Sequence, residues 1–218
     1  MLTVACVWIK SEIYQDRSWV DKLYWMVKRN LPVDYKYNFM CVTPHVNEFW
    51  GEEPAIGCEI PIIIPGNGYR AWWYKLNLFN LQGDRILYLD LDTVIHGDLT
   101  KLIDFPSDFV VCPSSGVPMR KHDFNSSIMV WNPASPQIQT VRSLLRSADM
   151  KRYSGDQQWL SSLPIRVDLF PSRWIHKYLP GKGVYEPEPE TIATLLIQGG
   201  KNEDLVKAGH SWIERYWH

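Results

Sequence analysis

Short apolar runs alternate along the first half of this chain with segments whose apolar residues recur at helical spacing. The run from Leu2 to Ile9 is followed by Val20, Leu23, Tyr24 and Val27, three or four residues apart or adjacent. Buried parallel strands read as continuous apolar runs, whereas amphipathic helices show this wider spacing. The alternation therefore predicts an α/β fold with a largely parallel central sheet flanked by helices.

The same patterns place further elements along the chain. We predict strands over residues 2–9, 37–43, 59–64, 85–90, 109–112, 127–131 and 191–198, and helices near 20–27, 70–81, 136–147 and 212–217. Ser18 and Ser135 stand where helix N-caps are expected. Within the second helix, Trp72, Leu76 and Phe79 are expected to be buried.

Composition narrows the class of protein. The 218 residues fit one domain, and the net charge of −1 without long basic runs argues against nucleic-acid binding. No stretch approaches the ~20 apolar residues of a transmembrane helix, and Met1 to Ile9 reads as a strand, not a signal peptide. Cys6, Cys41, Cys58 and Cys112 form no CxxC pair, so we expect reduced thiols in a cytoplasmic protein.

The strongest chemical signal is Asp90-Leu91-Asp92, which directly follows the apolar strand predicted over 85–90. If the chain stays extended, both carboxylates point to the same side. Ligands of open α/β sheets bind beyond the carboxyl ends of strands. Two converging carboxylates repel each other unless a cation lies between them, and Mg²⁺ or Mn²⁺ would suit that place. A solvated acidic turn is the alternative interpretation of so short a motif.

Six segments then follow one another in an order that matches a known family. They are Trp73–Phe79, Gly83–Val94, Gly97–Leu99, Phe124–Ser127, Gly155–Gln158 and Gln198–Lys201. Together they resemble glycosyltransferases of the GT-A fold, closest to the glycogenin-like group (family 8) and its small bacterial and viral relatives. The resemblance spans nearly the whole chain, with a nucleotide-binding half at about 1–100 and an acceptor-binding half at about 101–218.

The resemblance implies a role for each matching residue. The implied metal ligands are Asp90, Asp92 and Gln198, the implied catalytic residues are Asp156 and Gln157, and the implied nucleotide or donor contacts are Lys10, Ser11, Tyr14, Lys75, Asp90, Leu91, Asn125, Ser126 and Lys201. Gln198 departs from the family, which commonly has a histidine there. Asn202 likewise replaces the family's proline, and His210 is an alternative third ligand.

The activity implied is transfer of a sugar from a nucleoside diphosphate sugar, favoured as a UDP-sugar, to a carbohydrate acceptor hydroxyl. The family implies dependence on Mn²⁺ or Mg²⁺ and retention at the anomeric carbon. A haloacid-dehalogenase-type phosphatase fits less well, because Thr93 replaces the glycine of its DxDGT motif and about ninety residues precede the pair. A sugar-nucleotide pyrophosphorylase would need a glycine-rich N-terminal loop. A non-catalytic sugar-nucleotide-binding module stays open.

Overall fold

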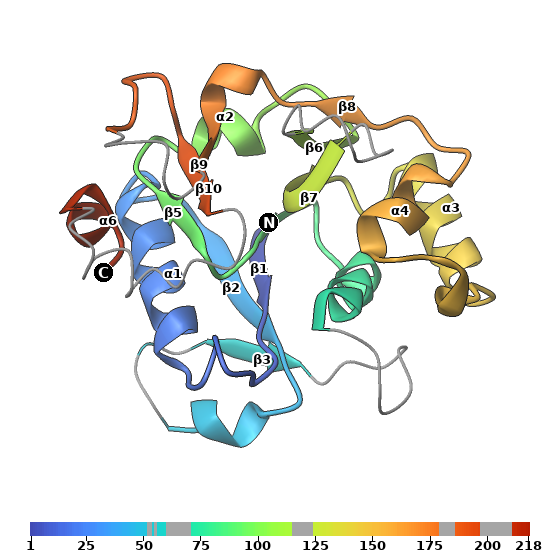
Figure 1. The fold of residues 1–218 in the computed structure, drawn as a ribbon, viewed down its shortest axis with the longest axis horizontal. Helices are drawn as coiled ribbons and strands as arrows, with labels where there is room; N and C mark the ends of the chain where they lie inside the picture. The colour runs from blue at the N-terminus through green and yellow to red at the C-terminus, as the bar shows by residue number, and fades with distance from the viewer. Residues whose placement is uncertain (52–53, 55, 60–70, 115–123, 179–185, 197–210) are drawn as a thin grey trace.

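The computed structural model describes residues 1–218 except 52–53, 55, 60–70, 115–123, 179–185 and 197–210 (Figure 1). The strands are β1 Leu2–Val7, β2 Tyr37–Val42, β3 Gly57–Glu59, β4 Arg85–Leu89, β5 Thr93–Ile95, β6 Phe109–Pro113, β7 Phe124–Trp131, β8 Asp168–Leu169, β9 Ile175–Tyr178 and β10 Ala193–Leu196. The α-helices are α1 Ser18–Arg29, α2 Thr100–Ile103, α3 Pro136–Leu145, α4 Asp156–Ser161 and α6 Ser211–Tyr216, and the 3₁₀ helices are η1 Val46–Phe49, η2 Ala71–Asn80, η3 Met150–Arg152 and η4 Ser172–Trp174.

Seven described strands form the central sheet in the order β3-β2-β1-β4-β7-β6-β8. From β3 to β4 all neighbours are parallel, and β8 is parallel to β6. β7 runs antiparallel to both β4 and β6. The predicted α/β fold is confirmed, and the sheet is mixed because β7 reverses direction. A smaller sheet, β5-β10-β9, lies beside it.

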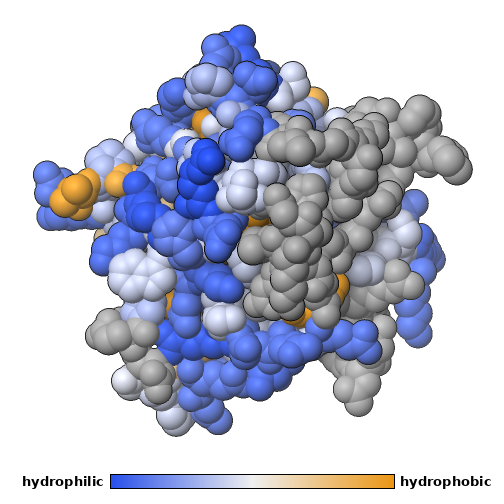
Figure 2. All heavy atoms as spheres, turned by 60° about the vertical axis from the view of Figure 1, so that its left-hand side comes forward, coloured by the Kyte–Doolittle hydropathy of each residue, from blue (hydrophilic) through white to orange (hydrophobic). Residues whose placement is uncertain are grey.

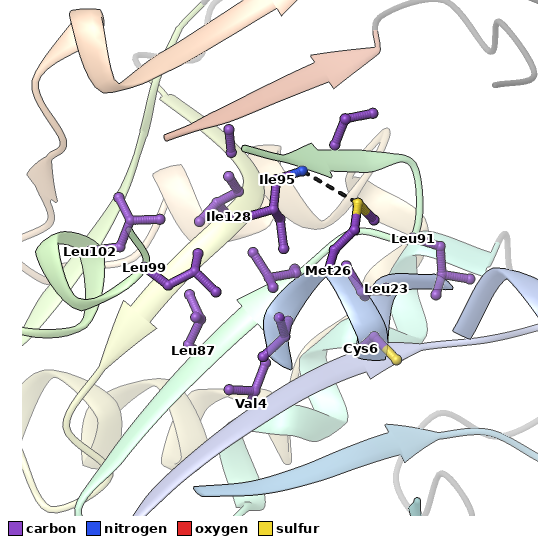
Figure 3. Close-up of a cluster of buried hydrophobic side chains, with 14 of the residues drawn as sticks. Val4, Cys6, Leu23, Met26, Leu87, Leu91, Ile95, Leu99, Leu102 and Ile128 are labelled. Carbon is purple, nitrogen blue, oxygen red and sulfur yellow. Dashed lines mark hydrogen bonds between the residues drawn. The ribbon is translucent and has the colours of Figure 1, made fainter. Parts of the chain in front are cut away.

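The two faces of the central sheet bury different sets of side chains. Val4 and Cys6 of β1 point into one apolar cluster with helix α1, which Figure 3 shows together with the contact from the Ile95 N–H to Met26 Sδ at 3.5 Å. Ala5, between them, packs into a second cluster with η2, α3 and α4. This alternation is what a pleated strand buried on both faces requires. Figure 1 shows α1 and the α3–α4 pair on opposite sides of the sheet.

The predicted N-cap is correct for helix α3 and wrong for helix α1. Ser135 caps α3, because its hydroxyl accepts the Ile138 N–H at 3.4 Å. The prediction that Ser18 caps α1 is wrong, since Ser18 is already the first helical residue and Arg17 stands at the N-cap. The Ser18 N–H is instead satisfied by the Asp16 carboxylate at 2.9 Å. An acidic side chain two residues upstream thus replaces the serine cap.

The helix predicted over 70–81 is a ten-residue 3₁₀ helix, η2. Its three residues per turn set Trp73, Leu76 and Phe79 on one line, and all three are buried. The predicted burial of Leu76 and Phe79 is therefore confirmed. That of Trp72 is wrong, because the tighter helix leaves this indole 37% exposed.

Other sequence predictions are met in part. The predicted strand 59–64 corresponds to β3, which begins at Gly57, and residues 60–64 lie outside the described residues. The strand predicted over 191–198 is β10, and residues 197–198 again lie outside. Cys6, Cys41 and Cys112 are buried free thiols, as expected. The side chain of Cys58 is not among those described.

One face of the described structure is mostly polar. Figure 2 shows hydrophilic residues over most of the described part of one face, with hydrophobic residues in small groups. No described helix has the length and apolar character to cross a membrane.

Gly97 lies where a side chain has no room. A Cβ there would come within 2.9 Å of both Ile192 Cα and the Thr191 carbonyl oxygen, which are backbone atoms of the segment entering β10. We predict that Gly97→Ala lowers the free energy of unfolding by about 1–3 kcal/mol, measured by urea denaturation. Gly57→Ala is the control, because its Cβ would meet Phe39 O at an ordinary 3.4 Å. Equal stability of both variants would contradict this packing.

His96 makes stability depend on pH. Its Nε2 lies 3.0 Å from Thr194 Oγ1, and burial, the largest cause, lowers its pKa from 6.5 to about 4. The neutral ring is thus favoured in the folded state, so its contribution is present above about pH 6.5 and is lost as the pH falls toward 4. We predict that the free energy of unfolding of the native chain, relative to that of His96→Gln, falls by about 1–3 kcal/mol between pH 6.5 and pH 4. Denaturation curves of both proteins across this pH range measure it. A constant difference across this range would contradict it.

Candidate functional site

The paired aspartates lie in a turn between β4 and β5. The Asp90 N–H donates to Ser127 O of β7 at 2.8 Å, and the Thr93 N–H donates to Asp90 O at 3.1 Å. The chain is therefore not extended through the motif, and a turn brings the carboxylates together. Leu91, between them, is buried in the core. Burial first, and then the charge of Asp90, raise the pKa of Asp92 from 3.8 to about 7.

A buried lysine organises the site. Lys75 of η2 is 5% exposed, and its Nζ lies 3.2 Å from Asp90 Oδ1, 3.6 Å from Asp156 Oδ2 and 3.3 Å from Ser126 Oγ. Burial opposes its charge, but the carboxylates of Asp156 and then Asp90 outweigh burial and raise the pKa of Lys75. One ammonium thus joins η2, the turn after β4, β7 and α4.

The predicted pair Asp156 and Gln157 opens helix α4. Asp156 is 4% exposed and accepts a short 2.5 Å hydrogen bond from the Ser126 hydroxyl, whereas Gln157 is half-buried. Gly155 precedes them in an extended conformation, and a Cβ there would lie 3.1 Å from the indole nitrogen of Trp72. The partly exposed Trp72 therefore packs beside the start of α4. It lies next to the group formed by Lys75, Asp90, Ser126 and Asp156, called here the Lys75 cluster.

Asn125 shapes the strand that carries Ser126. Its Oδ1 accepts the Ser127 N–H at 2.8 Å, so the side chain turns back on its own backbone. Ser126 itself is fully buried. Both residues lie at the beginning of β7, where Ser126 contacts Lys75 and Asp156 directly.

The loop after β1 approaches the same place. Lys10 is exposed and pairs with Glu48 at 2.5 Å, and the Ser11 hydroxyl accepts the backbone N–H of Tyr14 at 3.1 Å. The Tyr14 hydroxyl hydrogen-bonds to Asp92, and burial, followed by the charges of Asp92 and Asp90, raises the pKa of Tyr14. Of the three predicted nucleotide contacts in this loop, Tyr14 is the one that reaches the paired aspartates.

Sequence reasoning missed Tyr88. This residue of β4 is 2% exposed, and its hydroxyl donates to Asp90 Oδ1. Its position two residues before Asp90 could have indicated this contact, because residues i and i+2 of a strand face the same side. In the sequence, however, Tyr88 reads as one more member of an apolar run.

Gln198 and Lys201 lie outside the described residues. The described strand that leads to them nevertheless has an informative register. β10 is antiparallel to β5 and pairs Leu195 with Thr93, the residue that directly follows Asp92. In the described part of the chain, no group of three His, Cys, Asp or Glu side chains is arranged to hold a metal ion.

The fold is that of the GT-A glycosyltransferases. The galactosyltransferase LgtC, solved with donor and acceptor sugar analogues, aligns with a TM-score of 0.63 at 14% identity, covering 99% of this chain and 94% of that one. The apo form of the glycosyltransferase GlyE of Streptococcus pneumoniae TIGR4 aligns with a TM-score of 0.60 at 14% identity, covering 92% and 55%. The bifunctional glycosyltransferase WbbM gives 0.61 at 12% identity, covering 98% and 51%. The sequence matches no protein-family model and no curated protein.

Thus the chain spans nearly all of LgtC but about half the length of GlyE and WbbM. At these identities the likeness concerns the fold.

Removing the Lys75 charge should destabilise the protein. Lys75→Met keeps the length and the apolar stem but leaves the buried Asp156 and the partly buried Asp90 without their cation. We predict a loss of about 3 kcal/mol in the free energy of unfolding at neutral pH, measured by urea denaturation. Lys36→Met, at an exposed position before β2, should change stability by less than about 0.5 kcal/mol. A Lys75→Met protein as stable as the native chain would contradict the compensating role.

Proposed function

We propose that the protein is a divalent-metal-dependent glycosyltransferase that moves a sugar from a nucleoside diphosphate sugar, favoured as a UDP-sugar, to a carbohydrate acceptor hydroxyl with retention. The observation that carries this proposal is the Asp90–Asp92 pair, set beside the buried Lys75 at the carboxyl end of β4. The GT-A fold supports it, since LgtC, of the same fold, is a galactosyltransferase solved with donor and acceptor sugar analogues.

The residues present fit a hard divalent cation. Asp90 and Asp92 offer carboxylate oxygens, which Mg²⁺ and Mn²⁺ favour. Burial, and then the charge of Asp90, raise the pKa of Asp92, so a cation held by the two carboxylates would favour its charged form. The pairing of β10 with β5 supports Gln198 as a third ligand, because β5 begins one residue after Asp92 and β10 ends two residues before Gln198. When bound, the cation would act as a Lewis acid that neutralises charge on the departing diphosphate.

Lys75 would contribute a second positive charge to the donor site. Its ammonium is held in place by Asp90, Asp156 and Ser126, so it needs no reorganisation when the donor binds. We propose that Lys75 contacts the diphosphate or the sugar, and that Lys201 reaches the diphosphate from the segment after β10. Preorganised charges of this kind stabilise a transition state more than mobile ones do.

The remaining predicted residues take the other parts of the donor. Asn125 and Ser126 would line the sugar pocket, and Asp156 and Gln157 would face the anomeric carbon. The described contacts of the Asp156 carboxylate, from Ser126 and Lys75, fall on Oδ2, which leaves Oδ1 to stabilise positive charge on an oxocarbenium-like transition state. Lys10, Ser11 and Tyr14 would hold the nucleotide, with Leu91 contributing through its backbone.

The proposal is tested by Asp92→Asn. Because the variant removes one ligand charge, we predict at least a 100-fold loss of Mn²⁺-dependent UDP release from a panel of UDP-sugars, corresponding to about 3 kcal/mol of transition-state stabilisation. Melting curves check that the variant folds. Asp34→Asn, an exposed change before β2, is the matched control and should keep full activity.

Unchanged turnover by Asp92→Asn in Mn²⁺ would overturn the metal role. The same panel separates the enzyme from a non-catalytic binding module. A module would be stabilised by its nucleotide sugar, by about 2.7 kcal/mol at 100 times the dissociation constant, yet would release no UDP with any acceptor or with water.

A further inference from the structure

Both described donors to Asp90 use the same carboxylate oxygen. The Tyr88 hydroxyl donates to Oδ1, and so does Lys75 Nζ, at 3.2 Å. Lys75 Nζ also lies 5.2 Å from the centre of the Tyr88 ring, so the tyrosine and the lysine hold each other in place. Because both donors share Oδ1, the rotamer of Asp90 is fixed, and Oδ2 is the oxygen left to face a cation.

Asp92 has a tyrosine of its own. Tyr14 reaches it from the loop after β1, and its hydroxyl hydrogen-bonds to the Asp92 carboxylate. The Tyr14 ring packs edge-on against Trp19 of α1, with ring centroids 5.0 Å apart, and Trp19 packs against Trp217 at 4.9 Å. The backbone of Tyr14 is held as well, since the Trp8 indole donates to its carbonyl at 3.2 Å.

The two tyrosines come from opposite sides of the sheet. Tyr88 belongs to the apolar cluster formed with η2, α3 and α4, whereas Tyr14 packs on the cluster formed with α1. Each apolar layer thus supplies one hydroxyl to the carboxylate pair between them.

We propose that Tyr88 and Tyr14 are positioning residues that fix the Asp90 and Asp92 carboxylates, one each, for a divalent cation such as Mn²⁺. This inference rests on the proposed function. A neutral hydroxyl suits the task, because it satisfies one oxygen of a ligating carboxylate without adding a positive charge that would compete with the metal. Partners that orient metal ligands in this way typically change metal affinity by about 10–100-fold when removed.

The experiment measures Mn²⁺ affinity directly. Free Mn²⁺ is followed by electron paramagnetic resonance during titration of the full chain, with Mn²⁺ alone and with UDP present. Tyr88→Phe and Tyr14→Phe each remove one oxygen and keep the ring, and we expect the dissociation constant to rise about 10-fold or more in each. The double variant should rise further than either. Tyr37→Phe is the matched control, since Tyr37 begins β2 at the other end of the same sheet.

Melting temperatures of the metal-free variants separate positioning from packing. Tyrosine variants that lose thermal stability but bind Mn²⁺ like the native chain would overturn the inference. If one variant fails to fold, the other still tests it.

Asp92→Asn, titrated in parallel, separates this inference from the proposed function. Loss of Mn²⁺ binding in Asp92→Asn alone, with normal binding in both tyrosine variants, would overturn the inference and leave the metal site intact. Native affinity in Asp92→Asn, or no Mn²⁺ binding by the native chain, would overturn the metal site itself.

Discussion

The candidate site depends on one buried ammonium. Lys75 is 5% exposed and lies between a carboxylate from the turn after β4 and one from α4. A charge this deep is tolerated because Asp90, Asp156 and Ser126 satisfy it, and those carboxylates are in turn tolerated because of the lysine. The same atom therefore sets the position of α4 against the sheet and the charge of the site. Structure and chemistry cannot be changed independently here.

Much of the fold could be predicted from hydrophobic pattern. β1, β2, β4, β6 and α3 follow from apolar runs, helical spacing and the Ser135 cap. An apolar run does not encode strand direction, so the reversal of β7 was not predictable. Nor does a pattern of apolar residues distinguish three residues per turn from 3.6, so η2 and the exposure of Trp72 were missed. β5 has three residues and is too short to leave a periodic signal.

The candidate site was predictable as a set of residues, but not as a set of contacts. Asp90, Ser126 and Asp156 lie in ordered motifs, and the structure brings them to one lysine. The turn at Leu91 and the shared oxygen of Asp90 depend on backbone geometry that sequence spacing does not give. Tyr88 was not predicted, because a tyrosine within an apolar run is expected to be an ordinary core residue.

The pairing of β5 with β10 has a consequence for how this chain can vary. β5 starts one residue after Asp92 and pairs with β10 from Ile95–Ala193 to Thr93–Leu195, so this ladder fixes the position of β10 relative to the paired aspartates. Side chains alternate along a strand, so a slip of one residue would turn every side chain of β10 to the other face. Gly97 and the buried β10 residues oppose such a slip. Within this ladder, an insertion of two residues would keep the buried face of β10 buried, whereas an insertion of one residue would not.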